Sequence, residues 1–580
     1  MNSSSTVQAI AAGHRRVFDD HDNGGRASVV LPMGIIAIPA TGLIRPGGLF
    51  TVQESSDTAL LIGADSALVS GQQAIFAAPI VIAPVVVRRD GRIQTGGHLS
   101  DHVRLGFLED HLLPGVIERL VDRYGVGGNR LRRLSAAMTI RCVLTMTLLP
   151  NASLREVMTI TVGQLAKLPW ARPWWVPGGE VLTRHRRRIG EALFEELATD
   201  TCAQIALEPE HTSPPPRDDP LPGAAWSDAE LDVGRLGGLL LCSVDGMNTR
   251  CPDTAANRKT FGSAGTSDDS APYPQVRAVV VSVCSTRAVL GAALDGCSVG
   301  EQTLTARIAT DSKGVFTAGR LFLFDRNFLG ASLVADLLAT GAHLLMRMKA
   351  GITLPNLGWL PDGSYRSRLR KPDGEFINVR VVDYDVIPAE GTPTGELFCL
   401  VTDLLDHEAF PAAALAAAYP WRWTGSETTF KELKSTITDA GPSRGPIFRS
   451  TTPETVRQEF WAWITATNLI RAAARSAART PAPSTPTRPA RACPPRAVSF
   501  TATWHEATRS ILASTPTSLV HLARTLRTVR NQLNRDRHRA RVTKCRQQFP
   551  SAKPRTPTTT GPGRILIRRP LNLVLSPTTG

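Results

Sequence analysis

The sequence lacks the paired residues that organise zinc sites and disulfide-rich domains. Its nine cysteines are spread along 580 residues, with no Cys-x-x-Cys pair and no neighbouring pair of histidines. This spacing argues against a zinc site and against a disulfide framework, and it fits a reducing cytosol.

Long hydrophobic runs are also missing. The longest apolar stretch, Ala74 to Val87, has about 14 residues and contains two prolines, whereas a membrane-spanning helix needs roughly 20 residues. The N-terminus has no basic segment followed by an apolar one, so it does not resemble a secretion signal. We therefore predict a soluble protein with no membrane partner.

Acidic residues are scarce in the last quarter of the chain. Residues 441–580 contain 24 Lys and Arg against four Asp and Glu, whereas residues 1–440 contain 42 against 47. A concentrated basic region favours a polyanionic partner, of which DNA is the obvious one. A disordered, Arg-rich tail is the alternative interpretation.

The composition is otherwise that of a globular protein, with 42% hydrophobic and 20% charged residues, and the length allows two to four domains. Residues 1–95 contain scattered Gly and Pro and no clear periodicity. They are either a small β-rich segment or upstream sequence that is not part of the ancestral protein, and we favour the second.

Residues 100–207 have the periodicity of short helices, broken by Pro114 and Gly125. Ser153 and Glu156 form a capping-box pattern at the start of one helix. A later helix, expected to begin at Thr183, carries Arg184, Arg186, Arg187 and Arg188. We predict a helical DNA-binding domain, although a solvated basic face would give the same pattern. Residues 208–229 read as a Pro-rich linker.

Residues 230–350 alternate apolar runs with helical segments, which indicates an α/β sheet. Asp245 and Asp325 each follow an apolar run, so we expect both carboxylates at strand ends, with a polar loop after Asp245. Residues 351–418 show alternating apolar residues and turn signals, which predict an antiparallel β insertion.

The stretch Tyr419–Lys434 combines an aromatic residue, cations and a carboxylate at helical spacing. Arg422 precedes Glu427, and Lys434 follows it by two helical turns. Such a helix suits a site that holds a divalent metal and a phosphodiester together. Two strand-end aspartates followed by a helical glutamate is the order of a ribonuclease-H-like nuclease core.

These motifs resemble the DDE transposases of the insertion sequence four family. The family's third acidic motif matches Tyr419, Arg422, Glu427 and Lys434, with one extra residue between Arg422 and Glu427. The resemblance extends from about residue 100 to 555 and includes DGMN at Asp245 and FDRNF at Asp325. Many members have Thr where Met247 stands and Gly where Asn327 stands.

The resemblance implies an α/β fold with a ribonuclease-H-like core and a β-rich insertion, preceded by a helical DNA-binding domain and followed by a basic helical tail. It implies a DNA transposase in which Asp245, Asp325 and Glu427 bind two Mg²⁺ ions, with Mn²⁺ as a substitute. By resemblance, Tyr419, Arg422 and Lys434 contact double-stranded DNA around the cleaved strand. Arg347 and Lys349, at the end of the strand HLLMRMKA, are expected to contact DNA phosphates as well, although a solvated strand end would give the same pattern. Arg184, Arg187 and Arg188 of the basic helix are the remaining expected DNA contacts. A homodimer on paired element ends and a cytoplasmic, nucleoid-associated location are further expectations.

Two other functions share these residues. A ribonuclease-H-like nuclease without strand transfer needs the same three acids, and a decayed transposase binds DNA without cutting it.

The C-terminal part is expected to complete the core and then end in a basic tail. Residues 419–478 form the second part of the core, where an amphipathic helix places Trp461 and Trp463 in packing positions. Residues 479–503 are a Pro/Arg linker, residues 504–547 a basic helical region, and residues 548–580 a disordered tail.

Overall fold

The computed structural model describes most of the chain between residues 105 and 479. The described residues are 105–127, 134–162, 176–207, 234–263, 273–312, 314–349, 352, 354–388, 397–423, 425, 448–479, 503, 506–509 and 563–568, together with strands between residues 7 and 95. The predicted linkers, most of the basic region 504–547, and the residues Glu427 and Lys434 lie outside this set.

Residues 7–95 form small antiparallel sheets. Strands β1 and β2 pair with each other, β4 pairs with β5, and β3, β6, β7, β8 and β9 form a five-stranded sheet. The bounds are β1 Val7–Ala11, β2 His14–Phe18, β3 Arg26–Val30, β4 Ile36–Ile38, β5 Gly42–Ile44, β6 Leu49–Ser55, β7 Thr58–Gly63, β8 Val85–Val87 and β9 Ile93–Thr95.

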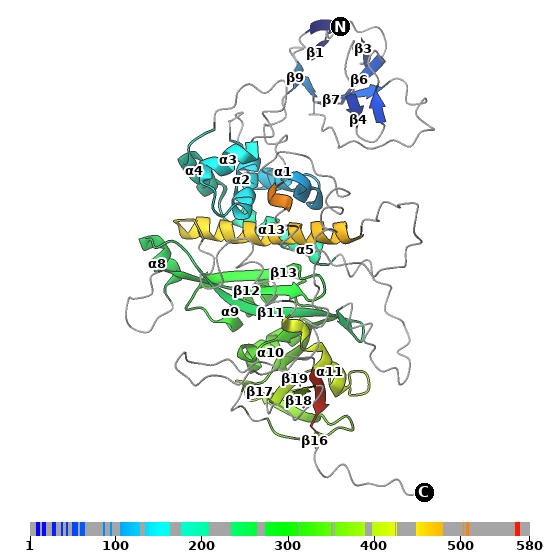
Figure 1. The fold of residues 1–580 in the computed structure, drawn as a ribbon, viewed down its shortest axis with the longest axis vertical. Helices are drawn as coiled ribbons and strands as arrows, with labels where there is room; N and C mark the ends of the chain where they lie inside the picture. Colours follow the sequence, from blue (N-terminus) through cyan, green and yellow to red (C-terminus); the bar gives the residue numbers. More distant parts are fainter. Residues whose placement is uncertain are drawn as a thin grey trace.

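The helical region begins after these strands. Its elements are the 3₁₀ helix η2 Gly106–His111 and the helices α1 Val116–Arg123, α2 Ala136–Leu148, α3 Leu154–Val162, α4 Gly179–Ile189 and α5 Ala192–Ala206. Helix α2 is buried at every position, because α1, α3 and α4 surround it (Figure 1). A helix that is covered on all sides is mostly apolar, and the buried Arg141 of α2 is paired with Glu109 and Glu118.

The helix starts agree with the sequence in one case and differ in another. The predicted capping box at α3 is confirmed, because Glu156 N donates to Ser153 Oγ at 3.2 Å and Ser153 N donates to Glu156 Oε2 at 3.3 Å. The predicted start of α4 at Thr183 is wrong. The helix begins at Gly179, and Thr183 donates from within its first turn to the carbonyl of Gly179 at 3.1 Å.

One eleven-stranded, mostly antiparallel sheet forms the centre of the molecule. Its order is β13-β12-β11-β14-β15-β19-β18-β17-β16, with β10 beside β11 and β20 beside β18. Only the pairs β11–β14 and β14–β15 are parallel. The strands are β10 Arg235–Leu236, β11 Leu239–Arg250, β12 Gln275–Val283, β13 Val289–Gly296, β14 Arg320–Phe324, β15 His343–Arg347, β16 Gly358–Trp359, β17 Tyr365–Arg370, β18 Phe376–Pro388, β19 Leu397–Thr402 and β20 Gly563–Ile567.

Two sequence-based predictions are wrong here. The polar loop expected after Asp245 contains the continuation of β11 and helix α8 Ala255–Phe261. The antiparallel strands predicted within residues 351–418 are present as β16 to β19, and β19 pairs with β15 of the central sheet. The tail expected to be disordered contributes β20, which pairs with β18 and adds an ion pair between Arg568 and Asp385.

Helices cover the two faces of the sheet differently. Helices α9 Glu301–Asp311 and α10 Ala331–Leu338 pack with alternate strand residues such as Val244 and Phe322 in one apolar core. Helix α11 Ala412–Ala418 packs on the opposite face with Leu241 and Leu323 in a second core. The alternation of side chains along β11 and β14 therefore separates the two cores.

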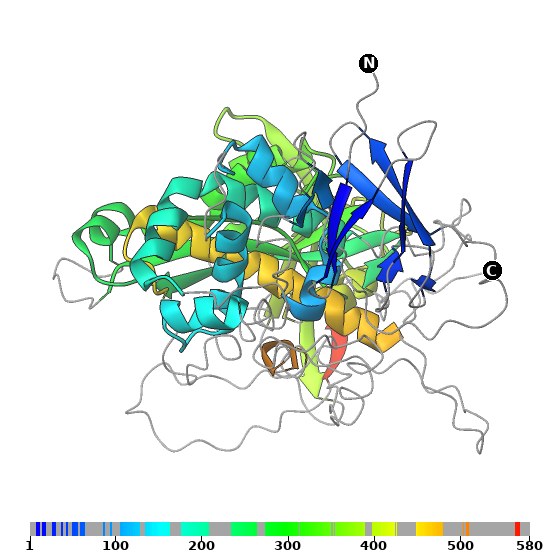
Figure 2. The same ribbon diagram turned by 90° about the horizontal axis from the view of Figure 1, so that it is seen from above.

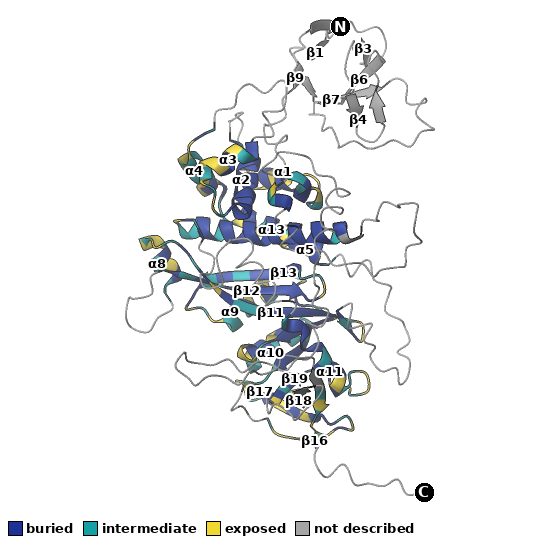
Figure 3. Cartoon of the chain, viewed as in Figure 1, coloured by how far each residue is buried: buried dark blue, intermediate teal, exposed yellow. Residues whose placement is uncertain are grey.

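Helix α13, Pro453–Arg479, lies between the N-terminal helices and the sheet, where it contacts α2, α5 and β13 (Figures 1 and 2). This amphipathic segment was expected to pack on the core, and it does: it is buried along most of its length because neighbours cover it on both sides (Figure 3). Trp461 and Trp463 are buried in this packing, as predicted. No described helix is long and apolar enough to cross a membrane.

Candidate active site

The pairing of β11 with β14 aligns the two predicted aspartates. The parallel register runs from Leu240 opposite Arg320 to Val244 opposite Phe324. Asp245 and Asp325 are the next residue on each strand, so they occupy neighbouring positions at the point where β14 ends. Adjacent strands are separated by about 4.8 Å, which brings the two half-buried carboxylates into one site.

Asp245 was expected at a strand end, and this position is wrong. Strand β11 continues to Arg250, because β12 pairs with it along that whole length. What ends beside Asp245 is the pairing with β14, since the chain turns into the 3₁₀ helix η4, Arg326–Phe328, directly after Asp325. The pairing of β11 with β14 therefore stops at Val244 and Phe324, one residue before each aspartate.

Arg422 and Tyr419 cover the aspartates on the α11 face. Arg422 is buried, and its Nη1 lies 3.7 Å from Asp245 Oδ2. The fully buried Tyr419 donates from its hydroxyl to the carbonyl oxygen of Phe324 at 3.1 Å. Burial raises the pKa of Tyr419 to about 12, so its hydroxyl remains a neutral hydrogen-bond donor that holds the end of β14.

Two further cations were predicted at the end of β15, next to β14. Arg347 is half-buried, and its guanidinium stacks on the ring of Phe398 at 4.2 Å. Lys349 is exposed. Both cations lie near the aspartate pair. The charges of Arg347 and Asp325 both influence the pKa of Tyr419, and the charges of Lys349 and Asp325 both influence the pKa of Glu301.

Glu301 is an acidic residue at this site that the sequence reasoning missed. It is the first residue of α9. Burial raises the pKa of its carboxyl group, Asp325 raises it further, and Arg277 and Lys349 oppose the shift. Spacing gave no signal for it, because only the return of α9 to the sheet brings position 301 beside position 246.

The chain approaching Glu427 is described as far as Gly425. A Cβ atom on Gly425 would lie 2.3 Å from Ser243 Oγ and 3.1 Å from Cys284 Sγ. Ser243 lies two residues before Asp245 on β11, on the same side of the strand. The glycine therefore allows the backbone after Arg422 to contact β11 close to the aspartates.

The predicted DNA-binding arginines of α4 belong to the N-terminal helices and are not part of the aspartate site (Figure 1). Arg184, Arg187 and Arg188 are exposed, as a surface contact requires. Arg186 is buried and does not share this exposure. It donates to Ser450 Oγ at 2.9 Å, to the carbonyl of Thr455 at 2.8 Å and to Gln458 Oε1 at 3.2 Å. Its spacing from Leu182 and Ile189 marks the buried side of the helix.

Comparisons with known proteins identify two transposase regions in the chain. The family model for the insertion element 4 transposase N-terminal domain matches residues 102–199, and that for the transposase DDE domain matches residues 237–469. The transposase InsG for insertion sequence element IS4 of Escherichia coli (strain K12) is 26% identical over 376 residues, which cover 63% of this chain and 75% of that protein. The chain belongs to the DDE transposases of the insertion sequence four family.

The protein is therefore an enzyme, a DNA transposase, as the resemblance of its motifs predicted. Among solved structures, a cryo-EM structure of the piggyBac transposase synaptic complex with hairpin DNA covers 74% of this chain and 82% of its own, at 10% identity and a TM-score of 0.34.

The donor groups of the transposase suit a hard divalent cation, the type of ion that DDE transposases generally use. Among the described residues, no three His, Cys, Asp or Glu side chains converge closely enough to hold a metal ion by themselves. Magnesium, however, is commonly bound by one or two carboxylates, with waters and substrate phosphates completing its coordination. Asp245 and Asp325 provide two such carboxylates.

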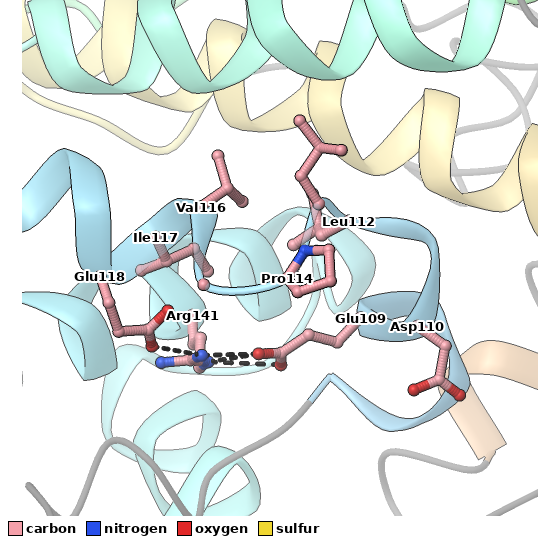
Figure 4. A pocket seen from close by; sticks show the side chains of 10 residues that line it. Glu109, Asp110, Leu112, Pro114, Val116, Ile117, Glu118 and Arg141 are labelled. Atoms are coloured by element: carbon pink, nitrogen blue, oxygen red, sulfur yellow. Dashed lines mark hydrogen bonds and ion pairs between the residues drawn. The ribbon is translucent and has the colours of Figure 1, made fainter. Parts of the chain in front are cut away.

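A pocket of about 560 Å³ lies elsewhere, among η2, α1 and α2 (Figure 4). Its charged lining consists of Glu109, Asp110, Glu118 and Arg141, and Arg141 donates to Glu109 and to Glu118. Three carboxylates against one guanidinium make this pocket unfavourable for a phosphate.

Proposed function

We propose that the transposase binds the ends of its insertion element, cuts the DNA there in the presence of Mg²⁺, and joins the freed 3′-hydroxyl to target DNA. The observation that carries this proposal is the alignment of Asp245 with Asp325 on neighbouring parallel strands. Two carboxylates at one opening, with Arg422 beside them, suit the phosphoryl transfer that cutting and joining both require.

The order of elements supports a ribonuclease-H-like core. Strands β11, β12 and β13 are antiparallel neighbours, α9 follows them, and β14 and β15 then add in parallel on the other side of β11. In this core the two aspartates occupy the central strand and its first parallel neighbour. The functional site lies where the pairing between them ends.

Each described side chain has a definite role in this proposal. Divalent cations held by the carboxylates supply Lewis-acid activation of the attacking oxygen and neutralise the charge of the leaving oxygen. Asp245 and Asp325 orient the site, and Arg422 offsets their charge and attracts the phosphate. Tyr419 fixes the end of β14 through its bond to Phe324, and because it is fully buried we assign it to positioning instead of DNA contact.

Glu427 is the proposed third acid. The contact of Gly425 with Ser243 supports this role. Ser243 is itself two residues from Asp245, so the described chain reaches β11 beside the aspartates just before the position of the proposed third acid.

The proposed DNA contacts fall into two groups. Lys349, Arg347 and Lys434 act near the cleaved strand together with Arg422, whereas the exposed Arg184, Arg187 and Arg188 of α4 bind the duplex of the element end. A dimer that holds two ends together, and a location at the nucleoid, complete the proposal.

A labelled DNA duplex containing one element end, incubated with the protein and Mg²⁺, tests this function. We expect cut and joined products from the wild type, and shifted but intact DNA from Asp245→Asn and Asp325→Asn. Asp336→Asn, which changes an exposed aspartate of α10, is the matched control and should cut normally.

The alternative functions predict different products. Nicks without joined product indicate a nuclease, and a shifted band without cleavage by the wild type indicates a binding protein. Normal cutting by Asp325→Asn contradicts the site itself.

A further inference from the structure

The first two residues of α9, Glu301 and Gln302, pack against the chain segments that follow the two aspartates. A Cβ atom on Gly246 would lie 2.1 Å from Glu301 Oε1 and 2.5 Å from its Cδ, and one on Gly330 would lie 2.6 Å from Gln302 Oε1. A side chain at either position would force the end of Glu301 or Gln302 to move, so the two glycines allow α9 to pack close to these segments. Glu301 thus touches the main chain directly after Asp245, and Gln302 touches the end of the turn that follows Asp325.

Gln302 also fixes this turn directly. Its Nε2 donates to the carbonyl of Asn327 in η4 at 2.9 Å. Helix α9 therefore connects the backbone beside Asp245 to the backbone beyond Asp325, from the face of the sheet opposite Arg422.

The carboxylate of Glu301 is not neutralised by a hydrogen-bonded partner among the described residues. No described residue donates a hydrogen bond to its carboxylate, and the charged groups that act on it are Asp325, Arg277 and Lys349. Arg277 is already bonded to Asn248 Oδ1 and to the carbonyl of Val299. A half-buried carboxylate beside another carboxylate is costly unless a cation offsets the repulsion.

We propose that Glu301 is a positioning residue of the cation site, whose negative charge, held against Gly246, increases the affinity of the Asp245 and Asp325 pair for a divalent cation. Glu301 acts from outside the ligand set, since no three acidic side chains among the described residues converge on one point. This inference rests on the proposed function, because it assumes that the aspartates hold a cation. It adds a residue that the motif of two aspartates and a glutamate does not contain.

Binding of Mn²⁺ to the full-length protein, measured by the loss of the free-ion electron paramagnetic resonance signal, tests the proposal without any DNA. We expect Glu301→Gln to weaken Mn²⁺ binding about 10-fold, the lower range for residues that support metal ligands. Glu301→Asp, which keeps the charge, should recover most of the affinity. Glu195→Gln is the matched control, because Glu195 is also a first-turn acid whose pKa is raised chiefly by burial.

The outcomes separate this inference from the proposed function. Wild-type Mn²⁺ affinity in Glu301→Gln, with weakened binding in Asp325→Asn, overturns the role of Glu301 and leaves the cation site intact. Unchanged affinity in Asp325→Asn as well overturns both. Equal weakening by Glu301→Gln and Glu301→Asp overturns the role of charge and leaves only a packing role.

Folding is checked by circular dichroism melts. Glu301→Ala is titrated in parallel as a second uncharged variant, so that one folded uncharged protein is available. Weaker binding in that variant supports the proposal, and unchanged binding overturns it.

Discussion

At the scale of residues, the candidate site contains close approaches of side chains to the backbone at two glycines. Gly425 lets the chain after Arg422 contact Ser243, and Gly246 gives Glu301 its place behind Asp245. In each case a missing side chain brings together segments that lie far apart in the sequence.

Gly425→Ala tests the first approach. The new Cβ atom would lie 2.3 Å from Ser243 Oγ, so the chain leading to Glu427 must move, at a cost of about 1–3 kcal/mol. We expect DNA cleavage to fall at least tenfold while binding of the element end is retained, as measured by gel assays of both steps.

The same clash predicts a suppressor. Ser243→Gly removes both atoms of Ser243 that the new methyl group would meet, so the double variant should regain part of the lost cleavage. Cleavage that is normal in Gly425→Ala, or unimproved in the double variant, would contradict the role of this contact.

The sequence singled out residues of the candidate site more readily than their surroundings. Asp245 and Asp325 stood out because each follows an apolar run, and the motif around Tyr419 and Arg422 connected them. Glu301 was missed because its proximity to Gly246 depends on how α9 packs. Arg186 was grouped with the exposed arginines of its helix, although it lies on the buried side.

At the scale of elements, α4 separates a structural arginine from surface arginines. Arg186 ties the helix to Ser450, Thr455 and Gln458 at the start of α13, whereas Arg187 is exposed one residue later. The two positions form a matched pair in which only one residue is buried.

Arg186→Ala should destabilise the protein by about 3–5 kcal/mol, because several buried polar groups lose their partner, and thermal melting measures this loss. Arg187→Ala should leave the melting temperature unchanged, weaken binding of the element end, and reduce the slope of log K against log salt by about 1. The reverse pattern of effects would contradict both assignments.

The connection between β18 and α11 gives a prediction about pH. Asp362 pairs with Arg380 of β18 and accepts from the amide of Ala412 at 2.7 Å. Burial alone would raise the pKa of Asp362, but its hydrogen bonds with Ser364 and the charge of Arg380 outweigh burial and lower it.

A lowered pKa means that this stabilisation is fully present above the unfolded value of about 3.9 and is lost as the pH falls through the folded value. Melting temperatures between pH 6 and pH 2 should therefore fall less steeply for Asp362→Asn than for the wild type. Parallel curves for the two proteins would show that Asp362 does not contribute.

The elements themselves were largely predictable, but their connections were not. Apolar runs predicted β11, β12, β13 and β14, and the capping box predicted α3. The pairing of β15 with β19 joins residues 345–347 to residues 400–402. A contact over such a distance leaves no local pattern, so the sequence predicted the strands after β15 but not their pairing with it.

At the scale of the whole molecule, one sheet and one helix connect the parts that the sequence suggested were separate. The sheet runs from β13 to β16 without interruption. Helix α13 packs against the N-terminal helices on one side and against β13 on the other (Figure 1). This central position explains why α13 is buried along most of its length. The helix also joins the proposed DNA-binding helices to the proposed catalytic sheet.

The central claim is that Asp245 and Asp325 form a single cation site. Iron(II) substituted for magnesium, with ascorbate and peroxide, cuts a polypeptide backbone close to the bound metal, and mass spectrometry of the fragments locates the cuts. We predict cuts near residues 245 and 325 in the wild type, with both lost together in Asp325→Asn. Cuts elsewhere, or a cut near residue 245 that persists in Asp325→Asn, would contradict the shared site.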